Sequence, residues 1–452
     1  MRVVHPNLKP GQKQVVIIGA GFAGLNAAKE LANHEEVHVV LLDQKNHHLF
    51  QPLLYQVATA GLNPADIAVP IRSVLSNARN VSVHLGRVER LSLTEKWVGA
   101  EEGIELGFDY LILACGALHS YFGKAEWEEY APGLKTVEQA IEIRRRILSA
   151  FELAENEIDA ERQRALLNFV IVGGGPTGVE MAGAIADISR TVLVKDFRRI
   201  NPASARVILV EAGPRILPAF PEDLAAKAVK DLAKLGVEVL TGTPVDEIDA
   251  DGVRIGPERI PSKTVIWAAG VKADRISERL GVELDRSGRV KVGPDLSIPG
   301  HPDIFVVGDL AHFEMENGQL LPGLAPAAIQ AGKATAKNIL ASLHGRPRKP
   351  FHYFDKGTMA TIGKRKAIAQ TGRLKLTGYI AWLAWLFIHI LYLVGFRNRV
   401  AVLLEWAWSY LFSKRGTRLI TSDEWKLYQV DLSHAAPVMV EHPENLSPAG
   451  RR

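Results

Sequence analysis

A glycine-rich turn near the N-terminus has the spacing that binds the diphosphate of a dinucleotide. Gly19, Gly21 and Gly24 follow the apolar run 15–18, and a helical pattern begins directly after them. In such a G-x-G-x-x-G turn, the first glycine permits the tight turn, the second lets the backbone approach the diphosphate, and the third lets the helix pack closely on the strand. The N–H groups at the helix N-terminus then favour the anion. Residues 19–24 therefore predict a dinucleotide site.

The same pattern occurs a second time in the chain. Gly173, Gly175 and Gly178 follow the apolar run 169–172, and Glu180 lies at the start of the next helical pattern. The repetition indicates an internal duplication rather than a solenoid. Two nucleotide sites in one chain suggest two cofactors in contact, one of which passes electrons to the other.

An acidic residue ends the second predicted strand of each unit. Asp43 follows the apolar run 37–42, and Glu211 follows the apolar run 207–210. A carboxylate at this position accepts a hydrogen bond from a ribose hydroxyl of the dinucleotide. Because its charge also repels a 2′-phosphate, we expect NADH rather than NADPH at the second site. The alternative for Glu211 is a solvated carboxylate at a strand end.

Two further carboxylates could face the cofactors. Asp309 follows the buried run 304–307, where it could accept hydrogen bonds from ligand hydroxyls. Glu180 lies in the first helical turn after the second glycine-rich loop, where the helix dipole favours a carboxylate. Glu180 could act only as such a helix-terminal charge. It could also lie beside the nicotinamide, where it would orient the carboxamide or relay a proton.

Two other segments and one cysteine each allow a functional or a purely structural interpretation. Segment 46–56 combines two histidines, aromatic residues and a proline. It either lines a flat aromatic ligand or forms a buried loop whose histidines bond locally. Cys115 follows the apolar run 110–114, and we expect it to be a small buried hydrophobic residue. The charged segment 136–164 is typical of a solvated helix.

Length and composition limit the function classes. A chain of 452 residues should contain two or three domains, and 47% apolar residues are enough for sizeable cores. A net charge of +4 does not suggest nucleic-acid binding, because the excess lies in an apolar C-terminal region. One cysteine excludes a disulfide framework within the chain, and we see no metal-ligand cluster. The N-terminus lacks the apolar region of a signal peptide, so the catalytic body should stay in the cytosol.

The C-terminal region contains an apolar segment suited to a membrane. Residues 379–396 carry no formal charge while the histidine is neutral, and they are long enough to span a bilayer. Their aromatic and polar residues recur every three or four positions, at Trp382, Trp385, His389, Tyr392 and Phe396. Tryptophan and tyrosine favour the headgroup level. Residues 364–418 carry ten Lys or Arg and one Glu, and segment 400–412 is too short to span back. We expect an in-plane anchor rather than a true span.

At these motifs the chain resembles the type II NADH:quinone oxidoreductases, single-subunit FAD enzymes of the respiratory membrane. The motifs that carry the resemblance lie at 19–24, 47–58, 173–180, 210–218, 307–309 and 396–399. The resemblance implies a non-proton-pumping enzyme in which hydride passes from NADH to FAD, and the reduced flavin then gives two electrons to a membrane quinone. It also implies tight, non-covalent FAD binding.

The resemblance also implies which residues contact each group. FAD is expected at Gly19, Gly21, Gly24, Asp43 and Asp309, and NADH at Gly173, Gly175, Gly178, Glu180 and Glu211. Further cofactor contacts are expected at Phe22, Ala23, Pro52, Gly116, Thr177, Gly270, Gly308 and Ala327.

The quinone is expected to enter from the membrane side toward Gln330, which we assign with Glu180 as a catalytic residue. Many family members have Ala-Gln-x-Ala-x-Gln-x-Gly where this chain has Pro326 in place of the first glutamine. Gln330 is therefore the amide left to bond a quinone carbonyl. The alternative is that the small residues of 325–332 pack a helix tightly on the first unit, with Gln330 bonded to backbone.

Together these features predict an α/β fold with two Rossmann-like dinucleotide-binding domains and C-terminal amphipathic helices that anchor it to a membrane. The expected FAD-binding domain comprises 13–118 and 290–345, and the expected NADH-binding domain comprises 165–272. An anchoring region at 346–420 and a flexible tail at 430–452 should follow. We expect a peripheral, monotopic enzyme of the respiratory chain at the cytoplasmic face of the bacterial inner membrane, with a homodimer as one option.

Rival functions share parts of this plan. Sulfide:quinone oxidoreductases and disulfide reductases have two such units but use paired redox cysteines, which a lone Cys115 cannot supply. A soluble reductase of the ferredoxin-reductase type fits the two units but not the apolar C-terminus. Another FAD- and NAD(P)H-dependent reductase, or a non-catalytic flavoprotein that senses NADH, remains an alternative.

Overall fold

The first glycine-rich loop emerges from a mostly parallel sheet. The computed structural model describes residues 5–101, 103–412 and 416–421, so the expected tail at 430–452 lies outside the described residues. The strand order of the sheet is β20-β21-β9-β1-β2-β5. Its strands are β1 (Lys13–Ile18), β2 (Val37–Asp43), β5 (Val81–Leu85), β9 (Tyr110–Leu113), β20 (Ser297–Ile298) and β21 (His301–Val306). The chain therefore leaves this sheet after Leu113 of β9 and returns to it at Ser297 of β20.

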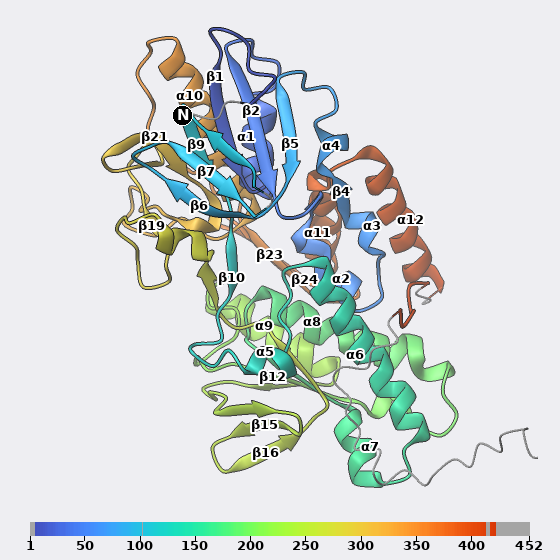
Figure 1. The fold of residues 1–452 in the computed structure, drawn as a ribbon. Helices are drawn as coiled ribbons and strands as arrows, with labels where there is room; N and C mark the ends of the chain where they lie inside the picture. Colours follow the sequence, from blue (N-terminus) through green and yellow to red (C-terminus); the bar gives the residue numbers. More distant parts are fainter. Residues whose placement is uncertain (1–4, 102, 413–415, 422–452) are drawn as a thin grey trace, which may run out of the picture. The chain divides into compact units, whose positions relative to one another are not determined.

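The central strands end at the same edge of this sheet. Ile18 of β1 lies opposite Leu42 of β2 and Leu113 of β9 in the parallel register. Each strand is an almost continuous apolar run because helices cover both faces of a parallel sheet. Helices α1 (Phe22–Glu30) and α10 (Ala325–Leu343) pack on each other beside it (Figure 1). Loops that follow β1, β2 and β9 consequently converge on one site.

A second parallel sheet repeats this arrangement, with strand order β13-β12-β11-β17. Its strands are β11 (Asn168–Val172), β12 (Arg206–Val210), β13 (Val237–Leu240) and β17 (Thr264–Trp267). Around it lie α6 (Val137–Asn156), α7 (Ala160–Leu166), α8 (Pro176–Asp187) and α9 (Glu222–Lys234). The antiparallel pair of β10 (Ala117–His119) and β18 (Val271–Ala273) connects the two halves. The predicted two-unit α/β fold is therefore confirmed.

Smaller elements complete the two halves. The short strands are β3 (His47–Leu49), β4 (Ala68–Pro70), β6 (Val88–Ser92), β7 (Trp97–Ala100), β8 (Glu105–Gly107), β14 (Glu247–Asp249), β15 (Gly252–Ile255), β16 (Glu258–Pro261), β19 (Val290–Lys291) and β22 (Ala311–His312). The short helices are α2 (Leu54–Ala58), α3 (Pro64–Ile67), α4 (Ile71–Val74) and α5 (Trp127–Tyr130).

The C-terminal region begins with an antiparallel sheet of β23 (Thr358–Gly363), β24 (Lys366–Thr371) and β25 (Leu374–Thr377). Helices α11 (Gly378–Tyr392) and α12 (Phe396–Phe412) follow. Strand β23 lies so close to α8 that a Cβ on Gly183 would overlap the carbonyl oxygen of Ile362. Within the described residues, no helix combines the length and the apolar character needed to cross a membrane.

Two sequence-based expectations about exposure are wrong. Helix α6 was expected to be solvated, but Arg144, Arg145 and Arg146 are each no more than 5% exposed. Arg145 and Arg146 both donate to Glu142, which neutralises part of this buried charge. A run of charges predicts solvent only when no neighbouring element covers that face, and here α2 packs against α6.

The second wrong expectation concerns α11. Trp382 and Trp385 were expected at the headgroup level of a membrane, but they are 6% and 1% exposed. The exposed face of the helix instead carries Ile380, Leu383 and Phe387. Aromatic residues at helical spacing fit either environment, so only the packing decides which face turns toward the protein.

Candidate active site

The three glycines of the first loop have separate structural reasons. Gly19 has φ +98° and faces the backbone of Ala114, which a Cβ would overlap. A Cβ on Gly24 would overlap the carbonyl oxygen of Gly19, so this glycine brings α1 close to the loop. No atom lies within 4 Å of the position that a Cβ on Gly21 would occupy. The middle glycine therefore leaves open space, as the approach of a diphosphate requires.

The second loop has the same geometry. Gly173 has φ +112° and lies against the backbone of Ala268, while a Cβ on Gly178 would overlap the oxygen of Gly173. Gly175 again has no atom within 4 Å of its Cβ position. The three glycines of the two loops thus have equivalent surroundings, as expected from a duplication.

The two strand-end carboxylates hold their own glycine-rich loops. Asp43 accepts from the backbone N–H of Ala20 at 2.6 Å, and Glu211 accepts from that of Gly174 at 2.6 Å. The second oxygen of each carboxylate accepts from the N–H two residues further along the chain. Burial raises the pKa of Asp43, against the lowering effect of these bonds. A carboxylate has about four lone-pair sites, so each can still accept from a ribose hydroxyl.

Two adjoining cavities receive most of the residues expected to bind FAD. One, of about 200 Å³, is lined by Gly19, Gly21, Phe22, Ala23, Asp43, Gly116, Gly308 and Asp309. The other, of about 500 Å³, is lined by Phe22, Pro52, Thr177, Glu180, Gly270, Gly308 and Asp309. The shared residues show that one extended ligand could occupy both cavities. Gly24, Gly178 and Ala327 are not among the lining residues, and the two glycines act by packing.

A half-buried cation supports the fit of an anionic dinucleotide. Lys135 lines both cavities and has no ion-pair partner among the described residues. Burial lowers its pKa, and the carboxylate of Asp309 opposes this effect. Lys45 in the same cavity is already paired with Glu138. The residues present therefore fit FAD, whose negative charge would offset the cost of burying Lys135. Sequence reasoning missed Lys135 because it lies outside every motif.

A third cavity, of about 470 Å³, receives the residues expected to bind NADH. Gly173, Gly175, Glu211 and Gly270 line it. Gly270 also lines the 500 Å³ cavity, so a dinucleotide could extend from Glu211 toward Glu180. Aromatic residues that the sequence reasoning did not single out cover this cavity, namely Tyr121, Phe122, Trp127 and Trp267. Three of them come from a connection before the second unit, where no local motif marks them.

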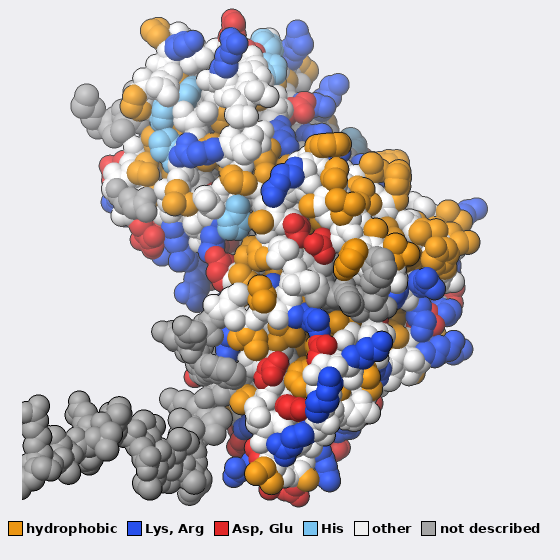
Figure 2. All heavy atoms as spheres, turned by 90° about the vertical axis from the view of Figure 1, so that its right-hand side faces the viewer, with side chains coloured by type: hydrophobic (Ala, Val, Ile, Leu, Met, Phe, Trp, Pro, Cys, Tyr) orange, Lys and Arg blue, Asp and Glu red, His pale blue; other side chains and the backbone are white. Residues whose placement is uncertain are grey.

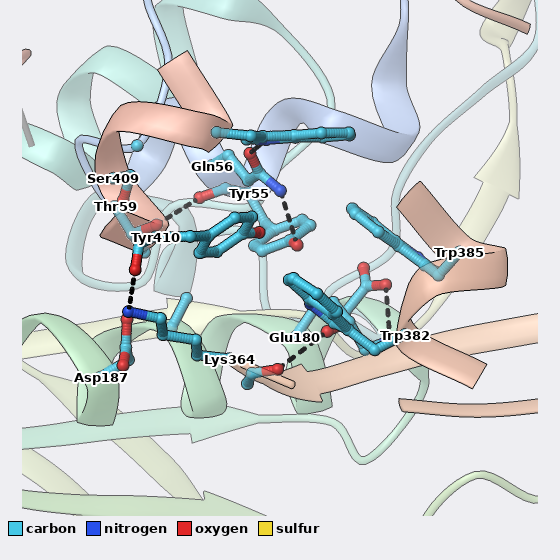
Figure 3. Close-up of a pocket in the computed structure, with 15 residues that line it drawn as sticks. Tyr55, Gln56, Thr59, Glu180, Asp187, Lys364, Trp382, Trp385, Ser409 and Tyr410 are labelled. Carbon is cyan, nitrogen blue, oxygen red and sulfur yellow. Dashed lines mark hydrogen bonds between the residues drawn. The ribbon is translucent and has the colours of Figure 1, made fainter. Parts of the chain in front are cut away.

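Glu180 lies at the wall between the 500 Å³ cavity and a small pocket under α11 and α12 (Figure 3). We call this the tryptophan pocket, since Trp382, Trp385 and Trp406 line it. Burial raises the pKa of Glu180 to about 8, and the backbone N–H of Thr361 opposes the shift from 3.5 Å. The carboxyl is therefore largely protonated at neutral pH, and it can donate a proton as well as accept one.

The tryptophan pocket also contains directed hydrogen-bond donors. The indole N–H of Trp406 donates to Gln56 Oε1 at 2.7 Å, and Gln56 Nε2 donates to the Tyr55 hydroxyl at 2.9 Å. Trp385 is 1% exposed, and its indole N–H has no hydrogen-bond partner among the described residues. A buried unpaired donor is costly unless a ligand supplies an acceptor.

Segment 46–56 combines the two alternatives that the sequence left open. His48 Nδ1 bonds the carbonyl oxygen of Ala20 at 2.9 Å, which is a local structural role. Pro52 and Tyr55 line the 500 Å³ cavity, and Tyr55 also lines the tryptophan pocket. The segment therefore holds the first glycine-rich loop with its histidine and faces ligand space with later residues.

Gln330 has the contacts of the structural alternative. Its Nε2 donates to the carbonyl oxygen of Phe354, and its Oε1 accepts from the N–H of Phe354, both at 3.0 Å. It is not among the residues that line the cavities described above. A Cβ on Gly332 would overlap the oxygen of Ala23, so the small residues of α10 serve close packing on α1.

Comparisons with known proteins agree with this geometry. The family model for pyridine nucleotide-disulphide oxidoreductases matches residues 13–332, and the model for the NDH2 C-terminal domain matches residues 355–415. The type II NADH:quinone oxidoreductase Ndh of Mycobacterium tuberculosis is 46% identical over 430 residues, covering 92% of each chain. The enzyme of the same name from Staphylococcus aureus is 30% identical over 367 residues, covering 79% of this chain and 90% of its own.

Solved structures show the same fold at lower identity. The structure of NDH2 from Plasmodium falciparum in complex with NADH has a TM-score of 0.83 and 19% identity, and it covers 91% of this chain and all of its own. The sulfide:quinone oxidoreductase of Aquifex aeolicus has a TM-score of 0.69 and 18% identity, covering 88% and 95%. The duplicated dinucleotide site, the C-terminal domain and the relatives agree, and the chain is an FAD-dependent oxidoreductase that belongs to the type II NADH:quinone oxidoreductase family.

Proposed function

We propose that this enzyme oxidises NADH at the 500 Å³ cavity and reduces a membrane quinone that enters through the tryptophan pocket. When bound, FAD supplies the redox chemistry, accepting two electrons from NADH and delivering them to the quinone. The observation that carries the proposal is the position of Glu180, which lines both cavities with a carboxyl that is largely protonated at neutral pH. From there it can supply a proton to a quinone as electrons arrive.

The aromatic part of the tryptophan pocket suits a flat quinone ring, and Asp187 and Lys364 also line the pocket. Flat aromatic rings form its walls, and aromatic side chains pack well against another flat ring. Within the described part of the chain the N–H of Trp385 is unpaired, and a quinone carries two carbonyl acceptors. Gln330, whose amide bonds Phe354, has a structural role in this proposal.

We further propose that α11 and α12 dock on the surface of a membrane without crossing it. Their exposed faces carry large apolar side chains, at Ile380, Leu383, Phe387, Leu391, Leu403, Leu404, Trp408 and Leu411. Figure 2 views the side of the molecule where these helices lie, and it shows hydrophobic side chains gathered beside Lys and Arg side chains. An apolar face with basic neighbours suits an anionic lipid surface. The proposed location is the cytoplasmic face of a bacterial inner membrane, and a homodimer stays a prediction.

Stopped-flow spectroscopy of the two half-reactions tests the quinone pocket. NADH should bleach the flavin absorbance anaerobically, and a short-chain ubiquinone should restore it. Ser409→Phe adds a ring at the pocket lining and should slow only the second step, whereas Gln330→Leu should slow neither step. If Gln330→Leu slows reoxidation selectively and Ser409→Phe does not, the quinone binds near Gln330. FAD content measured for each variant shows that the fold is retained.

A further inference from the structure

Three buried side chains link the outermost helix to the boundary between the two cavities. Trp406 of α12 is 4% exposed, Gln56 of α2 is 8% exposed and Tyr55 of α2 is 7% exposed. The bond from Trp406 to Gln56 spans 350 positions of the chain, so it is a tertiary contact rather than a local one. Figure 3 shows Gln56 and Tyr55 at the tryptophan pocket, joined by their hydrogen bond.

The chemistry of these groups gives the chain of bonds one direction. An indole N–H can only donate, so Trp406 must meet the oxygen of the Gln56 amide. The amide nitrogen is then turned toward the Tyr55 hydroxyl, which accepts from it. A phenol that accepts on one side directs its own proton elsewhere. The orientation of the Tyr55 hydroxyl therefore depends on a residue of α12.

Tyr55 lies at the boundary between the two cavities. Its side chain lines both the 500 Å³ cavity and the tryptophan pocket, as Glu180 does. In Figure 3 its hydroxyl lies toward the space between Trp385 and Tyr410. The rings of Tyr55 and Trp385 meet edge to face, with centroids 6.3 Å apart. Two donors, the Tyr55 hydroxyl and the Trp385 indole, thus belong to one aromatic enclosure.

We propose that the Tyr55 hydroxyl donates a hydrogen bond to a quinone carbonyl, and that Trp406 and Gln56 are positioning residues that aim this hydroxyl. The inference rests on the proposed quinone pocket.

The experiment separates quinone binding from NADH oxidation in the full-length, FAD-loaded enzyme with a short-chain ubiquinone. Tyr55→Phe removes the donor and keeps the ring, so the quinone KM should rise roughly threefold to tenfold, as expected for one lost neutral hydrogen bond. Trp406→Phe should also raise the quinone KM, and by no more than Tyr55→Phe does. NADH-driven bleaching in single turnover should keep its wild-type rate in Trp406→Phe, because Trp406 does not line the 500 Å³ cavity.

Trp97→Phe is the matched control. This substitution also removes an indole N–H donor, which in the wild type donates to Glu95 at 2.8 Å. Trp97 lies in β7, and no residue of β7 lines the cavities described above. This control should leave the quinone KM unchanged. If Trp406→Phe fails to retain FAD, Gln56→Met breaks the same relay at its middle residue.

A double variant distinguishes a relay from two independent effects. Since Trp406 acts through Tyr55, adding Trp406→Phe to Tyr55→Phe should raise the quinone KM no further. Additive increases would overturn the relay, and a wild-type quinone KM in Tyr55→Phe would overturn the donor. If quinone fails to reoxidise the wild-type flavin at all, the proposed function fails instead, so the two failures are distinguishable.

Discussion

Glu180 is a carboxyl of the active site whose pKa is strongly raised. The carboxyl is buried between two cavities, and the nearby backbone N–H of Thr361 is a distant donor at 3.5 Å. Desolvation therefore dominates and raises the pKa to about 8. A carboxyl with this pKa is in its acid form at neutral pH, which suits a proton donor to a quinone.

The first prediction is a pH dependence that belongs to Glu180. Reoxidation of the flavin by quinone should slow as pH rises through about 8, because the donor loses its proton there. The amide of Glu180→Gln has no titratable proton to transfer. This variant should therefore lower the rate of flavin reoxidation at neutral pH and remove its pH dependence, while FAD content stays intact. Stopped-flow traces from pH 6 to 9 measure the effect. A wild-type rate and pH profile in the Gln variant would leave Glu180 only its role at the helix terminus.

The same pKa predicts the sign of a stability effect. The folded carboxyl keeps its proton up to a pKa of about 8, whereas the unfolded one loses it near the ordinary glutamate pKa of 4.5. Between these values the folded state binds more protons, so the free energy of unfolding should fall as pH rises, and level off above about 8. Urea unfolding of wild type and Glu180→Gln at pH 5, 7 and 9 checks this. The free energy of unfolding of the wild type minus that of Glu180→Gln should fall as pH rises from 5 to 9.

Glu211 leads to a prediction about nucleotide choice. Its carboxylate is fixed by the N–H groups of Gly174 and Gly213, with its charge at the cavity that should hold the adenosine of NADH. Glu211→Ala should narrow the preference for NADH over NADPH, because the repulsion of a 2′-phosphate is lost. Glu211→Gln removes the charge but keeps the size of the side chain and one oxygen that can accept from the loop. This variant therefore distinguishes the effect of charge from that of shape. An unchanged ratio of kcat/KM values in both variants would remove Glu211 from nucleotide selection.

At the scale of elements, α11 and α12 each have two faces with different tasks. The inward faces place three tryptophans in the pocket, and the outward faces leave large apolar side chains exposed. Deleting the two helices would therefore destroy the pocket as well as the proposed anchor. Substitution of outward residues alone separates the two roles.

The prediction for the outward face uses Leu383, Phe387 and Leu404, which are 45%, 65% and 65% exposed. Changing all three to Ser should abolish flotation with phosphatidylglycerol vesicles and leave FAD content unchanged. Burying one large apolar side chain contributes about 1.5–3 kcal/mol, so the loss in partitioning should exceed roughly a hundredfold.

The matched control changes exposed apolar residues on other elements. Leu85, Ile158 and Val194 are 52%, 88% and 40% exposed, and the same three changes to Ser there should leave vesicle binding intact. Equal loss of binding in both triple variants would show that general apolar exposure, rather than the two helices, holds the protein on the vesicle.

At the scale of the whole molecule, two helical glycines form two junctions. Gly183 of α8 lies against the oxygen of Ile362 in β23, and Gly332 of α10 lies against the oxygen of Ala23 in α1. The first junction joins the second unit to the C-terminal sheet. The second closes the return of the chain onto the first unit.

A single added methyl group should therefore give different defects at the two junctions. Alanine is favoured over glycine in a helix by about 1 kcal/mol, but overpacking a tight contact costs about 1–3 kcal/mol. Gly183→Ala should displace Thr361 from Glu180 and slow reoxidation by quinone, whereas Gly332→Ala should speed loss of FAD. Stopped-flow rates and FAD release measure the two effects. The same phenotype in both variants would contradict two separate junctions.

The sequence alone determined the features that depend on short, local patterns. The glycines of both loops and the carboxylates Asp43 and Glu211 lie where the spacing predicted, because a strand, a turn and a helix fix their relative positions. Only the tertiary structure decided which face of a helix is covered. In the tertiary structure Trp382 and Trp385 are buried, and Gln330 forms hydrogen bonds with Phe354. Trp406 donates a hydrogen bond to Gln56 across 350 positions of the chain. Residue type and periodicity fit a lipid surface and a protein pocket equally well, so these contacts depend on packing between segments far apart in the chain.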